Sequence, residues 1–425
     1  MIRGYSMVKT VVIIDNNATA AGGTAQVAVA SAVELSKMGI RVLYFAGPDE
    51  VCPQLRSSAV EVCTAGTYGI NTDPNKLRAA VNGIWNSRNA RELKKLLAAL
   101  DPETTIVHIH GYIHYLSVSI FKVCKDLGFR TVLTLHDYFT ACPCGGFYDY
   151  GEKRICQRKP MSLQCMVCNC DKRSYFQKVW RMVRQVLVNH YVRFNQLLEF
   201  ICISEFSYSK IAPWLNGQNT YYVRNPYDLG DDRVYEAEKN TDYLFVGRLS
   251  EEKGLDIFCE AMSSLMQENA IGGRAIVVGD SARRQDYQKR YPQINFVGWK
   301  THDEMKEYMR NARALVFPSR WYEGAPLTPV EFMAHGIPCI ISDCCAGVEY
   351  ISHGNNGLLF RHEEIKNLIS AVRKAEDNGI WSDIASNLRD TFLRDDYSVR
   401  KHAEALLQVY EEIADKQNAE NYRRR

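Results

Sequence analysis

Short runs of aliphatic and β-branched residues recur along this 425-residue chain, and each run ends in a polar or glycine-bearing loop. In the first half these runs cover residues 8–15, 41–47, 105–111, 131–137 and 200–207. Helix-like segments lie between them, and the one at 27–38 is apolar enough to be buried and is closed by Gly39. Strands that alternate with helices in this way are typical of a parallel α/β sheet.

A second series of strands follows residues 223–242, a polar stretch with proline and several aspartates that has the composition of a linker. Its apolar runs cover residues 243–250, 274–280, 294–299, 314–319, 338–343 and 357–360. The chain is therefore predicted to be α/β, with two doubly wound, Rossmann-like domains facing a central cleft. We place these domains at 1–225 and 226–400, and expect a last helix, 401–425, to pack back on the first domain.

The charge balance argues against one class of function. Lysine and arginine total 52 and aspartate and glutamate total 49, so the formal net charge is +3 and we expect no nucleic-acid partner. The apolar run at 11–14 is cut off by Asp15, too soon for a signal peptide, and no apolar stretch reaches the roughly 18 residues of a membrane span. We therefore expect a cytoplasmic protein whose thiols stay reduced.

Two cations follow the first strand of the second series. Arg248 and Lys253 lie in the loop between that strand and a helix that Gly254 opens. An arginine fork and a lysine point charge beside a helix N-terminus suit a diphosphate. A solvated loop with two ordinary basic residues is the alternative.

Two carboxylates come later in the second half. Glu323 lies in a loop and Glu331 in a helix that should start near Thr328, so the second carboxylate faces back toward the loop that holds the first. Carboxylates accept hydroxyl hydrogens well, which suits a ribose and a sugar, and the free amides around Leu327 and Thr328 suit a phosphate. A capping glutamate and a glutamate on the helix surface are the alternative.

These motifs resemble a known family. "GRLSEEKG" at 247–254, followed by "PSRWYEGAPLTPVEFMAHGIPCIISD" at 318–343, is similar in content and order to the donor half of the family 4 type retaining glycosyltransferases with the GT-B fold. "GGTAQV" at 22–27 and "LTLHD" at 133–137 extend the resemblance to nearly the entire chain. Ala325, Thr328 and Pro329 depart modestly from the usual pattern, which leaves the identity of the donor sugar open.

The resemblance implies a role for each matching residue. Arg248 and Lys253 would hold the donor diphosphate, and Glu331 the ribose hydroxyls. Glu323 and His136 would act beside the donor sugar as catalytic residues, although a structural hydrogen-bonding role is the alternative for His136. The expected donor-binding residues are Gly22, Gly23, Arg248, Lys253, Gly324, Leu327, Thr328 and Glu331.

The chain contains no Asp-x-Asp pair, the carboxylate motif that a metal-dependent transfer generally needs. We therefore expect no cofactor for catalysis, with Arg248 and Lys253 neutralising the leaving diphosphate. The resemblance implies retention of configuration, with the departing phosphate helping to deprotonate the acceptor, and we assign no nucleophile.

Six cysteines crowd into residues 142–170. They are Cys142, Cys144, Cys156, Cys165, Cys168 and Cys170. Thiolates at Cys-x-x-Cys spacing can share one metal, so structural zinc in an inserted loop is the leading interpretation, ahead of unbound reduced thiols and of an iron–sulfur cluster. Because the insertion follows His136, we expect it to border the acceptor side of the cleft and to help select the acceptor.

Residues 172–198 combine six basic residues with an apolar stripe at helical spacing, and they include no acidic residue. A helix of this kind can lie on an anionic membrane surface, which would suit a lipid-linked acceptor. An ordinary helix packed on its own domain is the alternative.

The sequence thus predicts a glycosyltransferase that moves a sugar from a nucleotide-diphosphate donor, a UDP- or GDP-sugar above all. Its acceptor would be a carbohydrate, lipid-linked or free, and the reaction would serve cell-surface polysaccharide synthesis. The protein would be cytoplasmic and contact the inner membrane face peripherally. The alternatives are a sugar-nucleotide epimerase or phosphorylase on the same fold, and a catalytically silent nucleotide-sugar sensor or zinc-stabilised scaffold.

Overall fold

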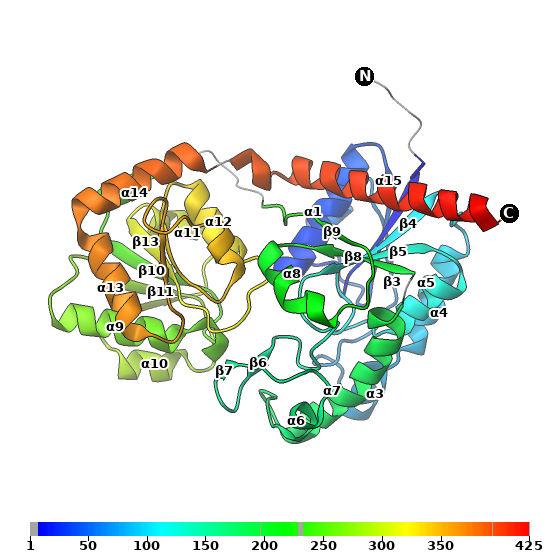
Figure 1. The fold of residues 1–425 in the computed structure, drawn as a ribbon, viewed down its shortest axis with the longest axis horizontal. Helices are drawn as coiled ribbons and strands as arrows, with labels where there is room; N and C mark the ends of the chain where they lie inside the picture. Colours follow the sequence, from blue (N-terminus) through cyan, green and yellow to red (C-terminus); the bar gives the residue numbers. More distant parts are fainter. Residues whose placement is uncertain (1–6, 196, 228–232, 393, 425) are drawn as a thin grey trace. The chain divides into compact units, whose positions relative to one another are not determined.

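The computed structural model of the chain describes residues 7–195, 197–227, 233–392 and 394–424. It divides into two compact units, each built on one parallel sheet (Figure 1). The first unit comprises the chain up to Gly146, Arg158–Pro226 and the chain from Tyr397, and the second comprises Phe147–Gln157 and Tyr227–Asp396. The predicted α/β class with two doubly wound sheets is confirmed. The predicted linker at 223–242 falls partly on 228–232, outside the described residues.

The first unit contains a seven-stranded sheet in the order β3-β2-β1-β4-β5-β8-β9. Its strands are β1 Thr10–Ile14, β2 Arg41–Ala46, β3 Glu61–Thr64, β4 Thr105–Ile109, β5 Arg130–Leu135, β8 Leu198–Cys202 and β9 Thr220–Tyr222. All five predicted strands are present, and the sequence analysis missed only the short edge strands β3 and β9. The strand order reverses between β1 and β4, so the loops after these strands line the point where such sheets bind ligands.

Helices cover both faces of this sheet (Figure 1). The helices of this unit are α1 Gly23–Lys37, α2 Pro53–Arg56, α3 Lys76–Asn82, α4 Ser87–Leu97, α5 Ser119–Asp126, α6 Leu163–Val167, α7 Tyr175–Val188, α8 Glu205–Ile211 and α15 Val399–Arg424. The last helix, α15, packs on α1 and buries Leu406 and Ile413 in the same core as β1 and β2. Its Tyr410 hydroxyl lies 2.6 Å from His108 Nδ1 of β4, which anchors α15 to this sheet.

The second unit contains a six-stranded parallel sheet in the order β12-β11-β10-β13-β14-β15. Its strands are β10 Asp242–Val246, β11 Ala275–Val278, β12 Asn295–Gly298, β13 Ala312–Phe317, β14 Cys339–Ser342 and β15 Leu358–Phe360, which are the six predicted strands. Its helices are α9 Leu255–Gln267, α10 Arg284–Arg290, α11 His302–Met309, α12 Leu327–Ala334, α13 Ile365–Glu376 and α14 Asn378–Thr391.

A two-stranded antiparallel hairpin, β6 Tyr148–Asp149 and β7 Arg154–Ile155, forms the middle of the cysteine-rich insertion. The hairpin packs with the second unit, although the chain enters and leaves it from the first. The insertion predicted at 142–170 is therefore divided between the two units.

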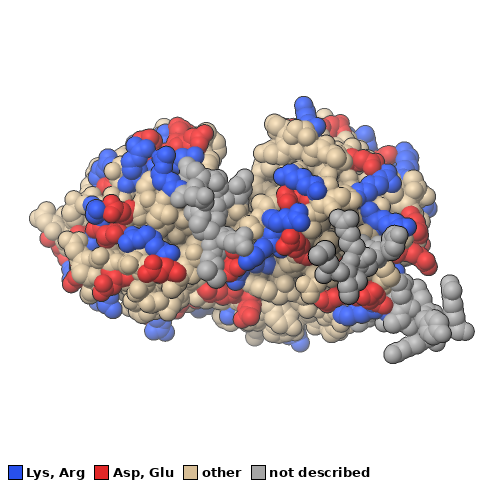
Figure 2. Space-filling view, turned by 90° about the horizontal axis from the view of Figure 1, so that it is seen from above, with Lys and Arg blue, Asp and Glu red and all other residues tan. Residues whose placement is uncertain are grey.

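The outer surface carries mixed charge. On the face shown in Figure 2, lysine and arginine side chains alternate with aspartate and glutamate side chains over both units. This pattern agrees with the small net charge of +3 and shows no broad basic field on this face.

Candidate active site

The loop after β10 is shaped by Gly254, which caps α9 with a φ of 72°. A Cβ atom at Gly254 would lie 1.9 Å from the carbonyl oxygen of Pro318, so only glycine fits both the backbone angle and the space. The short turn Glu251–Lys253 is thereby held against the end of β13. This contact brings the first predicted motif beside the second.

Lys253 and Glu323 form an ion pair across 70 positions of sequence. The same Glu323 oxygen, Oε1, accepts hydrogen bonds from Ser319 Oγ at 2.9 Å and Trp321 Nε1 at 2.7 Å. The side chains of Lys253 and Glu323 are only 18% and 12% exposed. Burial alone would raise the pKa of Glu323, but the charge of Lys253 and the three hydrogen bonds hold it below its usual value. Glu323 is therefore a carboxylate at neutral pH.

The start of α12 offers backbone donors. The helix begins at Leu327, its N-cap is Pro326, and no side chain caps its first turn. The amides of Leu327 and Thr328 thus lack helical partners, which suits an anion. Gly324, also predicted to bind the donor, lies in the half-buried loop that leads to this helix.

Glu331 lies in α12 and faces His302, the first residue of α11, with Oε1 3.2 Å from Nδ1. The hydrogen bond that His302 donates to Glu331 raises the pKa of His302 above its usual value. His302 is not among the predicted site residues, because a histidine beside charged residues at a helix start carries no distinguishing pattern. Arg248 is 70% exposed, and its guanidinium is 3.8 Å from Glu252.

In the first unit, His136 follows β5 and lies beside His110, which follows β4. His110 Nδ1 is 3.0 Å from His136 Nε2. Burial lowers the pKa of His136 to about 3 and that of His110 well below its usual range, so both rings are neutral at neutral pH. One ring nitrogen must then donate to the other, which fixes the orientation of His136. His110 is not among the predicted site residues.

Asp15 follows β1 and is also buried, with Oδ1 lacking a hydrogen-bond partner among the described residues. Burial raises its pKa to about 7. In the sequence Asp15 ends an apolar run and is not among the predicted site residues, although a carboxylate at the carboxyl end of a central strand is a signal that could have identified it.

Gly22 and Gly23 start α1. Gly22 has a φ of 92° and caps the helix without a side-chain hydrogen bond. A Cβ atom at either glycine would meet nothing within 4 Å, so the helix start is open to an approaching ligand.

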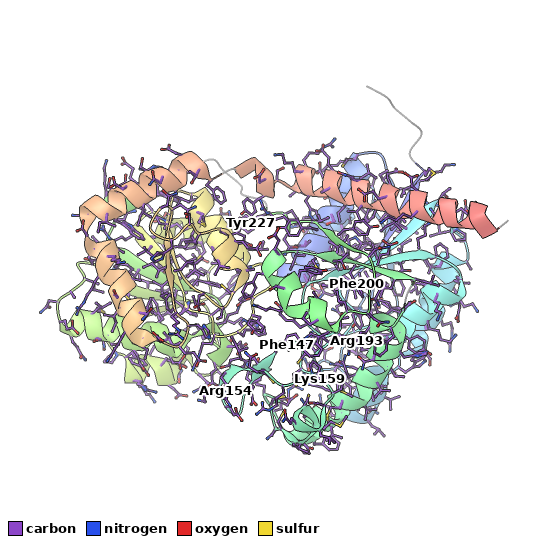
Figure 3. All side chains as sticks on the ribbon, in the orientation of Figure 1. Phe147, Arg154, Lys159, Arg193, Phe200 and Tyr227 are labelled. Atoms are coloured by element: carbon purple, nitrogen blue, oxygen red, sulfur yellow. The ribbon has the colours of Figure 1, made fainter. Side chains whose placement is uncertain are left out.

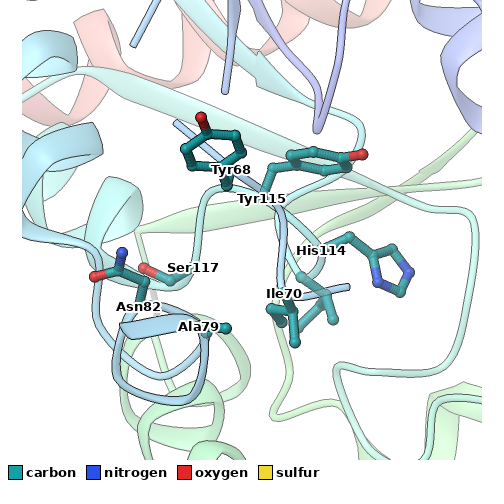
Figure 4. A pocket seen from close by; sticks show the side chains of 9 residues that line it. Tyr68, Ile70, Ala79, Asn82, His114, Tyr115 and Ser117 are labelled. Carbon is teal, nitrogen blue, oxygen red and sulfur yellow. The ribbon is translucent and has the colours of Figure 1, made fainter. Parts of the chain in front are cut away.

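A hollow near α3 in the first unit is lined by Tyr68, Asn82, His114 and Tyr115 (Figure 4). As it stands it has no room even for a water molecule. A second cavity, lined in part by Asn16, His110 and His136, measures about 20 Å³, enough for one water molecule. Neither could hold a sugar without a change in shape.

The cysteines of the insertion do not form a metal cage. Within the described residues, no group of three or more His, Cys, Asp or Glu side chains is arranged to hold a metal ion. Instead, Lys178 of α7 reaches between the sulfurs and donates to Cys170 Sγ at 2.9 Å and to Cys165 Sγ at 3.5 Å. Cys144 Sγ lies 3.8 Å from Cys170 Sγ.

The remaining cysteines of the insertion are Cys142, Cys156 and Cys168, and the Cys168 thiol also hydrogen-bonds to Cys170. Cys142 is buried in the first unit, Cys168 Sγ donates to the Cys165 carbonyl, and Cys156 lies beside the hairpin in the second unit. All are free thiols. The zinc interpretation stays a prediction for metal analysis, and the position of Lys178 gives it no support.

Comparisons with known proteins identify a family match in the second unit. Residues 240–378, which include both motifs of the second unit, match the family described as glycosyl transferases group 1. The chain is 23% identical over 223 residues to the UDP-Gal:alpha-D-GlcNAc-diphosphoundecaprenol alpha-1,3-galactosyltransferase of Escherichia coli, with 49% of this chain and 57% of that protein covered. It is 28% identical over 180 residues to the lipopolysaccharide core biosynthesis mannosyltransferase LpsB of Rhizobium meliloti, with 39% and 50% covered. The matched region spans about half the length of these curated relatives.

Solved structures show the same fold. Anabaena HepE in complex with UDP has a TM-score of 0.64 at 16% identity, over 95% of this chain and 100% of that chain. WaaG, a glycosyltransferase involved in lipopolysaccharide biosynthesis, has a TM-score of 0.63 at 16% identity, over 94% and 99%. At these identities the likeness concerns the fold alone. Residues 240–378 therefore match the group 1 glycosyltransferases, and the chain as a whole shares its fold with HepE and WaaG.

Proposed function

We propose that the chain transfers a sugar from a nucleotide-diphosphate donor to a carbohydrate acceptor in the synthesis of a polysaccharide or lipopolysaccharide. The observation that carries this proposal is the ion pair between Lys253 and Glu323, which unites two motifs that are distant in sequence. The uncapped start of α12 adds two backbone donors that suit a phosphate. A cation, free amides and a buried carboxylate in one unit are the groups that a sugar diphosphate requires.

The donor diphosphate is assigned to Arg248 and Lys253, the ribose to Glu331 and the donor sugar to Glu323. In this arrangement the two cations would neutralise the leaving diphosphate, and the chemistry would need neither a divalent ion nor another cofactor. Transfer would proceed with retention, as the family resemblance implies. His136 in the first unit would contact the donor sugar.

The relatives support a nucleotide sugar and a cell-surface product. HepE has been crystallised with UDP and with UDP-glucose, and the Escherichia coli relative is named for a UDP-linked galactose and a diphosphoundecaprenol acceptor. We infer that the donor of this chain is a UDP-sugar in preference to a GDP-sugar, and that its acceptor is lipid-linked.

Binding and transfer test the donor assignment separately. Thermal shift with UDP-, GDP- and ADP-sugars should identify one stabilising donor, and Lys253→Met should weaken its binding by about 100-fold, as expected when a buried charge loses its partner. The matched control is Lys366→Met, because Lys366 is an exposed cation on α13 of the same unit. Equal donor affinity in the Lys253 variant would refute the site.

A hydrolysis assay separates the alternatives. A silent sensor or scaffold would bind the donor without releasing nucleoside diphosphate. An epimerase would change the sugar without cleaving it from the nucleotide. Release of nucleoside diphosphate that depends on an added lipid-linked or free glycan would identify a transferase.

We also propose that the first unit contacts an anionic membrane through α3, α6 and α7. On α7 the usual arrangement is inverted, because Lys178, Arg184 and Gln185 are buried against the unit. Large apolar side chains on the three helices point outward; Leu77, Val81, Leu163, Val167, Phe176, Val179, Val183 and Val186 are all exposed. Exposed Lys159, Lys172 and Arg173 flank this apolar surface, and such a combination suits anionic lipid. No helix in the described part of the chain is long and apolar enough to cross a bilayer.

Vesicle flotation tests the membrane proposal. Vesicles with 30% anionic lipid should carry the protein at low salt, and Phe176→Asp should abolish the association because Phe176 is 77% exposed on this surface. Ile380→Asp, a similar change at an exposed residue of α14 in the second unit, should leave it unchanged. Equal flotation of wild type and the Phe176 variant would contradict the proposal.

A further inference from the structure

The β6–β7 hairpin contacts both loops that supply the candidate donor site. We propose that this hairpin is a positioning element of the donor site, which holds the loops of Lys253 and Glu323 in the arrangement that binds a nucleotide sugar. The inference rests on the proposed function for its ligand. Its structural part concerns only contacts within the second unit, to which the hairpin belongs.

The hairpin is well formed despite its short strands. Tyr148 pairs with Ile155 and Asp149 with Arg154, and the Cys156 amide donates to the Phe147 carbonyl at 2.7 Å. The buried Asp149 carboxylate accepts hydrogen bonds from two amides of the turn, at 3.0 and 3.1 Å. A hairpin of two-residue strands is marginal alone, so its order depends on what it packs against.

Two residues of the hairpin have left-handed backbone conformations although neither is glycine. Phe147 has a φ of 46° and Lys153 a φ of 56°. Such conformations are unfavourable for residues with a Cβ and persist where surrounding contacts compensate. These two residues are also among those whose side chains contact the donor loops, so the strain coincides with the contacts.

Lys153 contacts the first donor loop. Its ammonium forms an ion pair with Glu251 Oε1 at 2.5 Å. Glu251 begins the short turn that ends in Lys253, and its own side chain is only 20% exposed. The ion pair therefore fixes one end of a three-residue turn whose other end carries the candidate diphosphate ligand.

Phe147 and Gln157, at the two ends of the hairpin, contact the second donor loop. The Phe147 ring meets the Tyr322 ring edge to face, with centroids 6.4 Å apart, and a side-chain hydrogen bond joins Gln157 to Tyr322. Tyr322 directly precedes Glu323 in the chain. A displacement of the Tyr322 backbone would therefore displace the carboxylate that Lys253 binds.

The centre of the hairpin is buried against the same loops. Tyr148 is 1% exposed, and the charged groups that act on its hydroxyl include Arg320 and Glu251, one from each loop. Arg320 links the loops further, because its amide donates to the Glu252 carbonyl and its guanidinium to Asp256, each at 2.9 Å. The hairpin, the loop of Lys253 and the loop of Glu323 thus pack against one another. Figure 3 marks Phe147 and Arg154 on the hairpin.

Lys153→Gly gives the sharpest test because it separates the side chain from the strain. Glycine adopts a positive φ without cost, so this change should stabilise the hairpin if the Lys153 side chain does nothing. If the ion pair positions the donor loop, the same change should weaken nucleotide-sugar binding in calorimetric titration by about three- to fivefold. It should also raise the donor KM and leave the acceptor KM unchanged. Lys153→Arg, which keeps the positive charge, should have the donor affinity and the donor KM of the wild type.

Arg154→Ala is the matched control. Arg154 lies next to Lys153, carries the same charge and pairs with Glu152 inside the hairpin. This variant should bind the donor as the wild type does. Deuterium exchange provides a readout that needs no activity: the Lys153→Gly and Gln157→Ala variants should exchange faster in peptides 250–256 and 318–324, and Arg154→Ala should not.

The outcomes distinguish the inference from the proposed function. Donor affinity and exchange equal to wild type in both Lys153→Gly and Gln157→Ala would overturn the inference while leaving the proposed function intact. A wild-type protein that binds no nucleotide sugar would overturn the proposed function and, with it, the assigned ligand. Faster exchange across the whole second unit would also overturn the inference, because the hairpin would then serve general stability.

Discussion

Removal of the Lys253 charge should destabilise the second unit through Glu323. Glu323 is 12% exposed, so a carboxylate left without its cation cannot recover full hydration. Breaking a buried ion pair by removing one partner costs about 3 to 5 kcal/mol. Glu323 would keep its hydrogen bonds to Ser319 and Trp321, which places the expected loss for Lys253→Met at the lower end, about 3 kcal/mol.

Calorimetric unfolding measures this loss. About 3 kcal/mol corresponds to a fall of roughly 6 to 12 °C in the Tm of a unit of this size. Lys366→Met, on the surface of the same unit, should change stability by less than about 0.5 kcal/mol. The double variant Lys253→Met/Glu323→Gln should lose less than the sum of the two single variants, by about 1 to 3 kcal/mol, because both singles remove the same interaction.

Additivity would refute the reasoning. If the double variant loses the sum of the single losses, Lys253 and Glu323 do not stabilise each other and the pair is not the link between the two motifs. A fall in Tm for the Lys366 control equal to that for Lys253→Met would show that any lost cation has this effect.

Three further predictions follow from the same unit. Gly254→Ala would place a Cβ atom 1.9 Å from a carbonyl oxygen and should abolish donor binding, whereas Gly354→Ala, at a φ of 79° with nothing within 4 Å, should cost only about 1 to 2 kcal/mol in thermal unfolding. The pKa of His302 is raised, so its ion pair with Glu331 is complete at pH values below the usual histidine pKa and is lost as pH rises through the raised pKa. Loss of this ion pair should release Glu331 for the donor, so the donor KM should decrease as pH increases through the raised pKa. His302→Ala should remove this pH dependence of the donor KM. The pKa of Glu323 is lowered in the folded protein, so the ionised carboxylate contributes its full stability at pH values above the usual glutamate pKa, and this contribution is lost as pH falls through the lowered pKa. Glu323→Gln should therefore remove this decrease of Tm at acidic pH.

The strands of both sheets could be predicted because buried parallel strands leave a local signal in the chain. The runs at 105–111 and 243–250 are aliphatic, short and bounded by polar loops, and both became central strands. The edge strand β9, with the sequence "TYY", has three residues and half-exposed side chains, so no such signal marks it. The chain order of the candidate donor residues was visible, but their pairing depends on Gly254 and Pro318, whose contact no local pattern encodes.

The buried face of α7 could not be predicted from periodicity. The pattern of Phe176, Val179 and Val183 marks a helix with an apolar stripe, but it does not say whether the stripe faces the core. The structure buries Lys178 and Arg184 instead: Lys178 donates to the Cys170 sulfur, and Arg184 contacts the Pro143 carbonyl, the Phe139 ring and the Trp180 ring of its own helix. The contacts with Pro143 and Phe139 come from the tertiary fold, so the sequence of residues 172–198 alone could not show that two of their six basic residues are buried. His110 was missed for a similar reason, since its significance lies in its neighbour across the sheet.

The path of the chain through the hairpin has a practical consequence for expressing the two units separately. The polypeptide passes between its two units four times, after Gly146, Gln157, Pro226 and Asp396. An expression fragment that starts at Tyr227 and ends at Asp396 would look complete by sequence, yet it would leave Glu251 and Tyr322 without the side chains that contact them. A donor unit produced alone would therefore need residues 147–157 added as a synthetic peptide or grafted through a linker. Measurements on a fragment that lacks them would describe an incomplete site.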